Sequence, residues 1–361
     1  MRDKPEGALR RGWTTGACAT AATAAAYGAL VTGDFADPVT ITLPKGEQPS
    51  FPLKTKKIGK GWARASIVKD AGDDPDVTHG AEISVTVRPG RPGAGVIFQA
   101  GKGVGRVTKP GLPIPPGEPA INPRPRDMMR QAVADLAERL GGPEDVEIEI
   151  AVPGGERIAE QTWNPRLGIV GGLSILGTTG IVIPYSCSAW IHSIHRGIDV
   201  ARATGLGHVA GATGKVSEAA VKARYNLDDG ALIDMGDFAG GMLKYLRRHP
   251  VRRVTIAGGF AKLAKLADGH LDLHSGRSQV DIAALAEGLG QLGASARIVA
   301  RAHDAHMAGE VLEIAREADL PLADLVARRA RQTALATLAG GIELDVLVVD
   351  RTGAIIGEAG G

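Results

Sequence analysis

A short loop near residue 70 gathers acidic side chains around an imidazole. The stretch Val68–Gly80, VKDAGDDPDVTHG, contains Asp70, Asp73, Asp74, Asp76 and His79. Because its glycines and its proline disfavour a regular helix, we expect an irregular loop, here called the acidic loop. Carboxylates and an imidazole at this density could bind a divalent cation, oppose a cationic ligand, or move a proton.

Three interpretations of the acidic loop remain open. Its carboxylate spacing does not match the twelve-residue calcium loop, which ends in a glutamate, so a calcium site is disfavoured. Aspartate side chains that accept hydrogen bonds from nearby amides would make the loop a structural turn. In the functional interpretation, a carboxylate acts as a base or stabilises charge next to a substrate, and His79 relays a proton.

Glycine-rich turns follow apolar runs at three places in the second half of the chain. They are Gly177-Thr178-Thr179-Gly180, Gly211–Gly214 and Gly258-Gly259. Ligands of parallel sheets bind at the carboxyl ends of the strands, and glycine lets a ligand approach the backbone closely. We expect all three turns to lie in one sheet and at least one to line a site, although any strand-to-helix turn favours glycine.

Known nucleotide fingerprints are not matched by these turns. Gly214 and Lys215 are followed by Val216, where a phosphate-binding loop requires serine or threonine. The glycines of GLGHVAG precede their strand, whereas those of a dinucleotide fingerprint follow it. The sequence therefore gives no support to ATP hydrolysis or to a standard NAD site.

Histidine and cysteine spacing predicts no metal bound by the protein itself. His270 and His274 are four residues apart, a spacing that pairs imidazoles on a helix, but glycines bracket them and no third ligand is evident. Cys18 and Cys187 are far apart and lack CxxC spacing, so we expect neither a zinc site nor a disulfide.

A basic, stiffened segment extends over residues 88–126. It holds nine prolines, eight glycines and seven Lys or Arg residues against one acid, Glu118. A solvated connection would explain this composition, but long loops inside compact domains are often functional. Cations on a proline-rich loop would suit an anionic ligand at low ordering cost.

Length and composition set the broad class. The chain has 361 residues, which suggests two domains, and 44% of them are hydrophobic, which is enough for sizeable cores. The net charge of +2 argues against nucleic-acid or membrane-surface partners. The charged N-terminus lacks the apolar core of a signal peptide, so we expect a cytoplasmic protein. Homo-oligomerisation is left open.

Hydrophobic patterning predicts two architectures in sequence. Alternation over Trp62–Val68 predicts a strand, and RDMMRQAVADLAERLG, at residues 126–141, predicts an amphipathic helix. Alternating strands and two helices favour an α+β domain over residues 1–155, which would carry the acidic loop and the basic loop. From residue 168, short apolar runs alternate with helical stretches, which predicts an α/β, Rossmann-like domain over 156–361 with a mostly parallel sheet and helices on both faces. The first of these helices, Ser186–Thr204, should bury a stripe of Ile191, Ile194, Ile198 and Ala201. ASARIVAR, at residues 294–301, is among the runs that we expect to be strands.

Six segments occur in an order that resembles one family, the cobalt-precorrin-5B C(1)-methyltransferases of cobalamin biosynthesis (CbiD). They are RRGWTTGACATAA, VKDAGDDPDVTHG, INPRPRDMM, NPRLGIVGGLSILGTTGIV, MGDFAGGML and VTIAGGFAKLAKLADGHLDLHS. Each segment alone is weakly specific, but their joint order is specific.

The resemblance implies a reaction and a set of site residues. S-adenosylmethionine would donate a methyl group to C-1 of a contracted tetrapyrrole that brings its own cobalt. The substrate's acetate and propionate carboxylates would contact Arg11, Thr14, Thr15, Lys102, Arg106, Arg124 and His274. The donor would contact Gly177, Thr178, Thr179, Gly180, Asp237, Gly258 and Gly259. The implied catalytic residues are Asp70, Asp73 and His79, on a loop that we hypothesise to face the junction of the two domains.

Two departures from the family pattern concern ligand contacts. Asp237 stands in GDF where the family has asparagine, and an ionised aspartate cannot donate a hydrogen bond. After GTTGIV the chain continues IPYSCSAWIHSIHRG, where the family has a proline and an acid-rich helix start. The alternative functions are a non-catalytic tetrapyrrole carrier and an NAD(P)H-dependent corrin oxidoreductase, of which the second lacks its fingerprint.

Overall fold

The computed structural model describes residues 7–361, which fall into two compact units. The boundary between the units lies between Cys187 and Ser188 in the sequence. This boundary lies later than the one expected at residue 155. The reason is that the segment after residue 155 supplies one helix and three short strands whose partners belong to the first unit. Each unit is described by itself below.

The first unit is built on a mixed five-stranded sheet. Its strand order is β4 (Thr55–Gly59), β5 (Trp62–Val68), β6 (Glu82–Pro89), β10 (Val146–Ala151) and β7 (Val96–Ala100). All neighbours are antiparallel except β10 and β7, which are parallel. Buried and partly exposed residues alternate along β10, as expected for strands with one face on the core.

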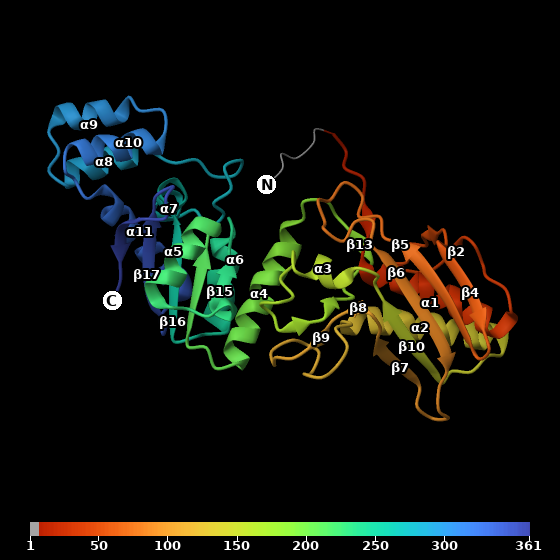
Figure 1. The fold of residues 1–361 in the computed structure, drawn as a ribbon. Coiled ribbons are helices and arrows are strands. Elements are labelled where there is room, and N and C mark those ends of the chain that lie inside the picture. Colours follow the sequence, from red (N-terminus) through yellow and green to blue (C-terminus); the bar gives the residue numbers. More distant parts are fainter. Residues whose placement is uncertain (1–6) are drawn as a thin grey trace. The chain divides into compact units, whose positions relative to one another are not determined.

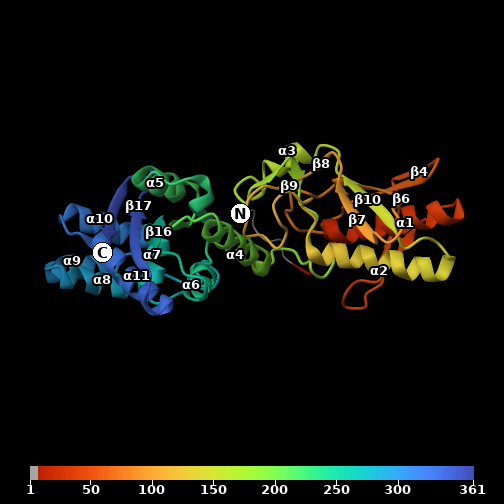
Figure 2. The ribbon, with the colours of Figure 1, turned by 90° about the horizontal axis from the view of Figure 1, so that it is seen from below.

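Two long helices cover the apolar face of this sheet. They are α1 (Thr15–Thr32) and α2 (Pro123–Leu140), which pack against each other, and α1 also packs on β5 and β6 (Figure 2). Thr14 caps the start of α1 by accepting a hydrogen bond from Ala17 N at 3.1 Å. The alanine-rich sequence of α1 favours a helix. The residues of its first turns, from Thr15 to Tyr27, are buried.

Short strand pairs complete the first unit beside the main sheet. They are β1 (Gly12–Trp13) with β13 (Ile181–Val182), β8 (Gly103–Val104) with β12 (Gly172–Leu173), β9 (Arg106–Val107) with β11 (Ile169–Val170), and β2 (Val39–Thr40) with β3 (Ser50–Phe51). The helix α3 (Gly155–Ala159) also belongs here. The Gly177–Gly180 turn leads into β13 of the first unit. The prediction that it lies in the same sheet as the Gly211–Gly214 and Gly258-Gly259 turns is therefore wrong.

A second five-stranded sheet organises the second unit (Figure 1). Its order is β15 (Leu232–Asp234), β14 (His208–Ala212), β16 (Arg253–Gly259), β17 (Glu343–Val349) and β18 (Ile355–Ala359). The first four strands are parallel and β18 is antiparallel. The chain leaves β14 for β15 on one side and then returns to β16 on the other, so the strand order reverses between β14 and β16.

Helices lie on both faces of this second sheet. The helix α5 (Lys215–Tyr225) packs on one face through Val221, with Ala210 and Leu347. The opposite face is covered by α4 (Cys187–Ala203), α6 (Ala239–Arg248), α7 (Phe260–Ala267) and α11 (Leu322–Leu338). Ile194 and Ile198 of α4 are buried there, within the stripe that the sequence predicts.

Three short helices form the part of the second unit between α7 and α11. They are α8 (Ile282–Gln291), α9 (Ala296–His303) and α10 (Ala308–Glu317), and they pack on one another (Figure 1). The ASARIVAR strand prediction is wrong, because this segment forms α9. Ser295 caps it by accepting a hydrogen bond from Ile298 N at 3.4 Å, and its alanines and arginines favour a helix. Over residues 7–361, no helix combines the length and the apolar character needed to span a membrane.

Candidate functional site

Three segments far apart in the sequence meet in the first unit. They are residues 10–16, the acidic loop, and residues 174–185, and we call them together the motif cluster. Trp13 N donates to Asp70 O at 2.7 Å, and Thr14 N donates to Gly180 O at 3.0 Å. The backbones approach so closely that a Cβ on Gly12 would lie 2.0 Å from the carbonyl carbon of Ala71. The glycine at this position is therefore required by packing.

Asp70 is held as an ionised carboxylate by Arg10. The guanidinium contacts both carboxylate oxygens, one of them at 3.0 Å, and Gly72 N donates to Oδ1 at 2.9 Å. The hydrogen bond from Arg10 is the main cause that lowers the pKa of Asp70 to about 2. A carboxyl group with this pKa is a weak proton acceptor, so Asp70 suits a charge-stabilising role better than that of a base.

The other loop carboxylates also accept hydrogen bonds from main-chain amides. Asp73 accepts from Arg10 N at 2.6 Å and Asp74 from Tyr185 N at 2.8 Å. Burial raises the pKa of Asp74 above its ordinary value, against the opposing hydrogen bond from Tyr185. Asp74 is thus a better-placed proton acceptor than Asp70, which sequence reasoning missed because the four aspartates look alike in the sequence.

His79 uses one ring nitrogen within the loop. Its Nδ1 accepts a hydrogen bond from Ala71 N at 3.1 Å and lies 3.8 Å from Asp70 Oδ1. A neutral imidazole that accepts through Nδ1 carries its proton on Nε2. The ring is more than half exposed, so Nε2 can donate to a ligand, whereas Nδ1 is already occupied as an acceptor.

A buried ion pair closes the base of the acidic loop. Lys69 Nζ lies 2.6 Å from Asp76 Oδ2, and the lysine side chain is only 1% exposed. Burial by itself would raise the pKa of Asp76, but attraction to Lys69 and hydrogen bonds from Lys69 and Thr78 outweigh it and lower the pKa. The contacts of the loop match the structural-turn interpretation, and the catalytic role of Asp70, Asp73 and His79 stays a prediction.

Two of the predicted substrate contacts have their hydroxyl groups committed to the fold. Thr14 Oγ1 caps α1, and Thr15 Oγ1 accepts from Leu176 N at 2.9 Å. Both threonines are buried, so they position the Gly177–Gly180 turn rather than face solvent. A Cβ on Gly177 would lie 2.3 Å from Thr14 Oγ1, which explains the glycine there. Within the turn, Thr178 is exposed and Thr179 is partly exposed.

Four predicted basic contacts are exposed on the first unit. Arg11 lies 3.7 Å from Glu47, and Arg106 donates to Gly117 O at 3.1 Å. Lys102 lies in the turn between β7 and β8, and Arg124 lies in the first turn of α2. Arg106 is the register partner of Val170, an apolar residue that is 60% exposed. A cation next to an exposed apolar side chain suits a macrocycle with carboxylate arms.

The second candidate site lies where β14, β15 and β16 end. Thr213 follows β14, Asp237 follows β15, and Gly258 and Gly259 are the last residues of β16. Thr213 N donates to Ala257 O at 3.0 Å, and a Cβ on Gly258 would lie 2.8 Å from Thr213 Cγ2. Nothing lies within 4 Å of a Cβ built on Gly259. The backbone is therefore open to a ligand at this edge, here called the switch-point edge.

Asp237 is the acidic group at the switch-point edge. Its side chain is 13% exposed, and Lys262 Nζ lies 2.6 Å from Oδ1. Among residues 7–361, none donates a well-aligned hydrogen bond to this Oδ1. Leu273 N donates to Asp237 O at 2.8 Å, and the buried Lys265 donates to Leu273 O at 3.0 Å. The segment around Leu273 is thereby fastened beside Asp237.

His274 lies in a turn next to this segment. Its Nδ1 accepts from Gly276 N at 3.1 Å, and its own main-chain N donates to Asp272 at 3.1 Å. The stretch from His270 to His274 is not helical, so the two imidazoles do not share a helix face. In the described part of the chain, no group of three or more His, Cys, Asp or Glu side chains could hold a metal.

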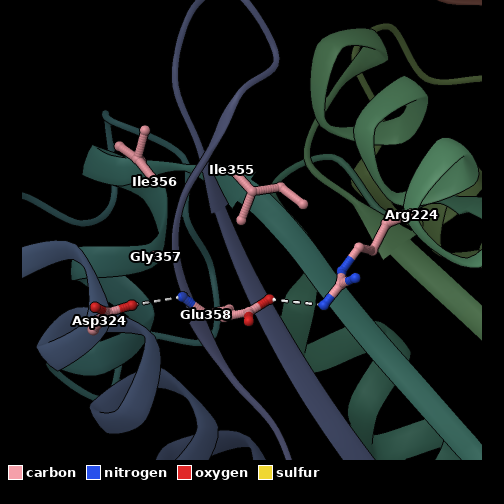
Figure 3. Close-up of a pocket in the computed structure, with 6 residues that line it drawn as sticks. All are labelled: Arg224, Asp324, Ile355, Ile356, Gly357 and Glu358. Carbon is pink, nitrogen blue, oxygen red and sulfur yellow. Dashed lines mark hydrogen bonds and ion pairs between the residues drawn. The ribbon is translucent and has the colours of Figure 1, made fainter.

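A shallow hollow beside the antiparallel edge strand β18 carries charges that pair with one another (Figure 3). Arg224 lies 3.4 Å from Glu358, and Glu358 N donates to Asp324 at 2.9 Å. The residues that line it are Arg224, Asp324, Ile355, Ile356, Gly357 and Glu358. Its strand β18 pairs with the last residues of β17, and β17 separates it from β16 and the switch-point edge, so we assign it no ligand.

The topology of the second unit defines an α/β protein of the doubly wound type, in which ligands bind beyond the carboxyl ends of the parallel strands. The chain belongs to the CbiD family. The family model described as CbiD matches residues 2–184, and the one described as "CbiD, C-terminal domain" matches residues 272–360. These matches confirm the resemblance seen in the sequence motifs.

Curated relatives extend this match over almost the whole chain. A protein of Paramagnetospirillum magneticum named "Cobalt-precorrin-5B C(1)-methyltransferase" is 64% identical and covers 98% of this chain and 99% of its own length. A protein of Halorhodospira halophila with the same name is 59% identical over 98% of this chain and 95% of its own. A crystal structure of the cobalamin biosynthesis protein (cbiD) from Archaeoglobus fulgidus is 26% identical, with a TM-score of 0.40 over 71% of this chain and 78% of that one.

Proposed function

We propose that this protein transfers a methyl group from S-adenosylmethionine to C-1 of cobalt-precorrin-5B, giving cobalt-precorrin-6A in cobalamin biosynthesis. The observation that carries the proposal is the 59% to 64% identity, over nearly both full lengths, to relatives that bear this activity in their names. In this proposal the substrate is a tetrapyrrole and the reaction takes place in the cytoplasm.

The methyl donor binds at the switch-point edge in this proposal. Asp237 has acceptor capacity to spare, and an ionised carboxylate only accepts hydrogen bonds, as the two ribose hydroxyls require. The backbone is open beside it at Gly259, whereas the side of Gly258 is filled by Thr213. A carboxylate in this position also favours the positive sulfonium. The Gly177–Gly180 turn belongs to the first unit, and its contact with the donor stays a prediction.

Basic side chains of the first unit bind the carboxylate arms of the substrate. Arg11, Lys102, Arg106 and Arg124 are exposed, and guanidinium groups can bind a carboxylate through two parallel hydrogen bonds. Val170 beside Arg106 offers apolar contact to the macrocycle. Several such contacts orient one ring carbon, which is what a reaction at a single position requires.

The chemical step needs orientation more than a reactive protein group. The C-1 carbon attacks the methyl carbon in line, a carbon–carbon bond forms, the carbon–sulfur bond breaks, and its electron pair stays on sulfur. Fixed carboxylates such as Asp70 and Asp73 attract the positively charged donor during binding, and this attraction weakens in the transition state as the charge is lost. Any proton that leaves the macrocycle passes to Asp74, whose pKa burial raises.

Labelled donor provides the direct test. Purified protein is incubated with cobalt-precorrin-5B and S-adenosylmethionine that carries a deuterated methyl group, and the products are examined by mass spectrometry. The proposal expects one labelled methyl group on the macrocycle and one equivalent of S-adenosylhomocysteine. Tetrapyrrole binding without donor binding in calorimetry would identify a carrier, and binding of NADPH with reduction of the macrocycle would identify an oxidoreductase.

A further inference from the structure

A lysine that sequence motifs did not single out stands beside the proposed donor site. Lys262 lies in the first turn of α7, which begins directly after β16. Its Nζ is 2.6 Å from Asp237 Oδ1 and 3.5 Å from Thr213 O. The ammonium group therefore reaches from the end of β16 towards the segments that follow β14 and β15. This is the edge of the sheet at which the strand order reverses.

The pair of Lys262 and Asp237 leaves hydrogen-bonding capacity unused. An ammonium group has three donors, and the two contacts of Nζ include one at the limit of hydrogen-bond length. Asp237 Oδ1 accepts no aligned hydrogen bond from any residue between 7 and 361. A ligand that offers hydroxyl donors to Asp237 and a carboxylate to Lys262 would satisfy both groups at once.

The next lysine of α7 shows how a structural lysine looks in the same helix. Lys265 is buried, at 6% exposure, and its Nζ donates to Leu273 O at 3.0 Å. The side chain of Lys262 is 38% exposed and faces Asp237 at the open edge, where a Cβ added to Gly259 or Gly214 would meet nothing within 4 Å. Lys262 is thus accessible to a ligand, whereas Lys265 is not.

We infer that Lys262 binds the α-carboxylate of the amino-acid moiety of the methyl donor, while Asp237 binds its ribose. This inference rests on the proposed function, because it requires the donor at the switch-point edge. A zwitterionic nucleoside thioether carries both groups, the hydroxyls at one end and the carboxylate at the other. Lys262 then determines specificity for donors that retain the amino-acid moiety.

Two nucleoside probes separate the roles of the two residues. S-adenosylhomocysteine carries ribose and the amino-acid moiety, whereas methylthioadenosine carries ribose without the amino acid. Titration calorimetry with the full chain compares the wild type with Lys262→Met and Asp237→Ala, which removes both acceptor oxygens. We expect Lys262→Met to weaken binding of S-adenosylhomocysteine about tenfold or more and to leave binding of methylthioadenosine unchanged. Asp237→Ala should weaken binding of both probes by about tenfold.

Matched controls account for loss of charge and for misfolding. Lys244→Met removes a cation from the exposed side of α6 and should change neither affinity. Lys262→Arg keeps the cation and should retain most of the affinity for S-adenosylhomocysteine. If Lys262→Met does not fold, as judged by its thermal midpoint, the comparison of Lys262→Arg with Lys262→Gln is read by the same criteria.

The possible failures are distinguishable. If Asp237→Ala weakens binding of both probes but Lys262→Met weakens both equally or neither, the inference about Lys262 is wrong and the donor site stands. If Asp237→Ala changes neither affinity while the wild type binds both probes, the donor lies elsewhere and the placement of the donor in the proposed function is wrong. If Lys262→Met loses affinity for S-adenosylhomocysteine and keeps its affinity for methylthioadenosine, the result supports both the role of Lys262 and the placement of the donor.

Discussion

Removal of Lys69 tests whether a buried charge pair holds the acidic loop in place. The variant Lys69→Met keeps the aliphatic stem of the side chain and deletes only the ammonium group, which lies 2.6 Å from Asp76. Loss of one partner from a buried ion pair costs about 3–5 kcal/mol, because the other charge is left without compensation. Asp76 keeps two hydrogen bonds from Thr78 and is 25% exposed, so we expect the lower end, about 3 kcal/mol.

The pH dependence of this loss has a definite sign. In the wild type the pKa of Asp76 is lowered on folding, so its contribution to stability is present at neutral pH and is lost as the pH falls through the folded-state pKa. Without Lys69, burial outweighs the hydrogen bonds from Thr78, and the pKa of Asp76 rises. The difference in stability between wild type and variant should therefore shrink as the pH falls below 7, because Asp76 of the variant becomes neutral at a higher pH than Asp76 of the wild type.

Hydrogen exchange with mass spectrometry is the suitable assay, because it reports stability separately for peptides of each unit. Lys60→Met, on the exposed turn between β4 and β5, is the matched control and should have no effect. The double variant of Lys69→Met with Asp76→Asn should recover at least about 1 kcal/mol, because no buried charge remains unpaired. A loss below about 1 kcal/mol at neutral pH, or a double variant as unstable as Lys69→Met alone, would refute the reasoning.

Three further predictions concern the sites and the packing. The double variant Asp70→Asn, Asp73→Asn should abolish methyl transfer while the thermal midpoint stays nearly unchanged, because exposed ion pairs contribute only about 0.2–1 kcal/mol; wild-type turnover would assign these carboxylates to structure. Arg106→Ala should raise KM for the tetrapyrrole about tenfold with little change in kcat, and added salt should reduce the difference in KM between wild type and variant. A loss confined to kcat would contradict the binding of a substrate carboxylate by Arg106. Gly177→Ala should lower the thermal midpoint, because φ of Gly177 is +127° and the new Cβ would lie 2.3 Å from the hydroxyl of Thr14, which caps α1. Gly28→Ala, at an open position within α1, should stabilise the protein by about 0.5–1 kcal/mol. Equal effects of the two substitutions in calorimetry would disprove this argument.

Local patterns predicted individual elements well where one face of an element is buried. The expected strand Trp62–Val68 coincides with β5, and the helix expected after Arg126 is α2, which begins earlier, at Pro123. Proline is favourable in the first turn because its missing N–H has no partner there anyway. The pattern could not distinguish a strand from a helix for ASARIVAR, since a short apolar run fits both. The cap at Ser295 favours the helix α9.

Tertiary placement was harder to predict than local structure. The Gly177–Gly180 turn follows an apolar run, as the turns after β14 and β16 do, but its partner strand β1 lies more than 160 residues earlier in the chain. Hydrophobic periodicity carries no information about such a partner. For the same reason the sequence could not show that Lys69 pairs with Asp76 or that Lys262 pairs with Asp237, because only the fold brings each pair together.

The pairing of β1 with β13 has a consequence for how the protein is made. Residues near position 12 must wait until residues near position 182 have left the ribosome before they can complete the motif cluster. At synthesis rates of about 5–20 residues per second this interval lasts roughly 10–30 seconds, during which α1 lacks the strand that anchors its N-terminal end. A nascent chain released shortly before β13 would therefore contain all five strands of the main sheet and both long helices, but not the strand that pairs with β1.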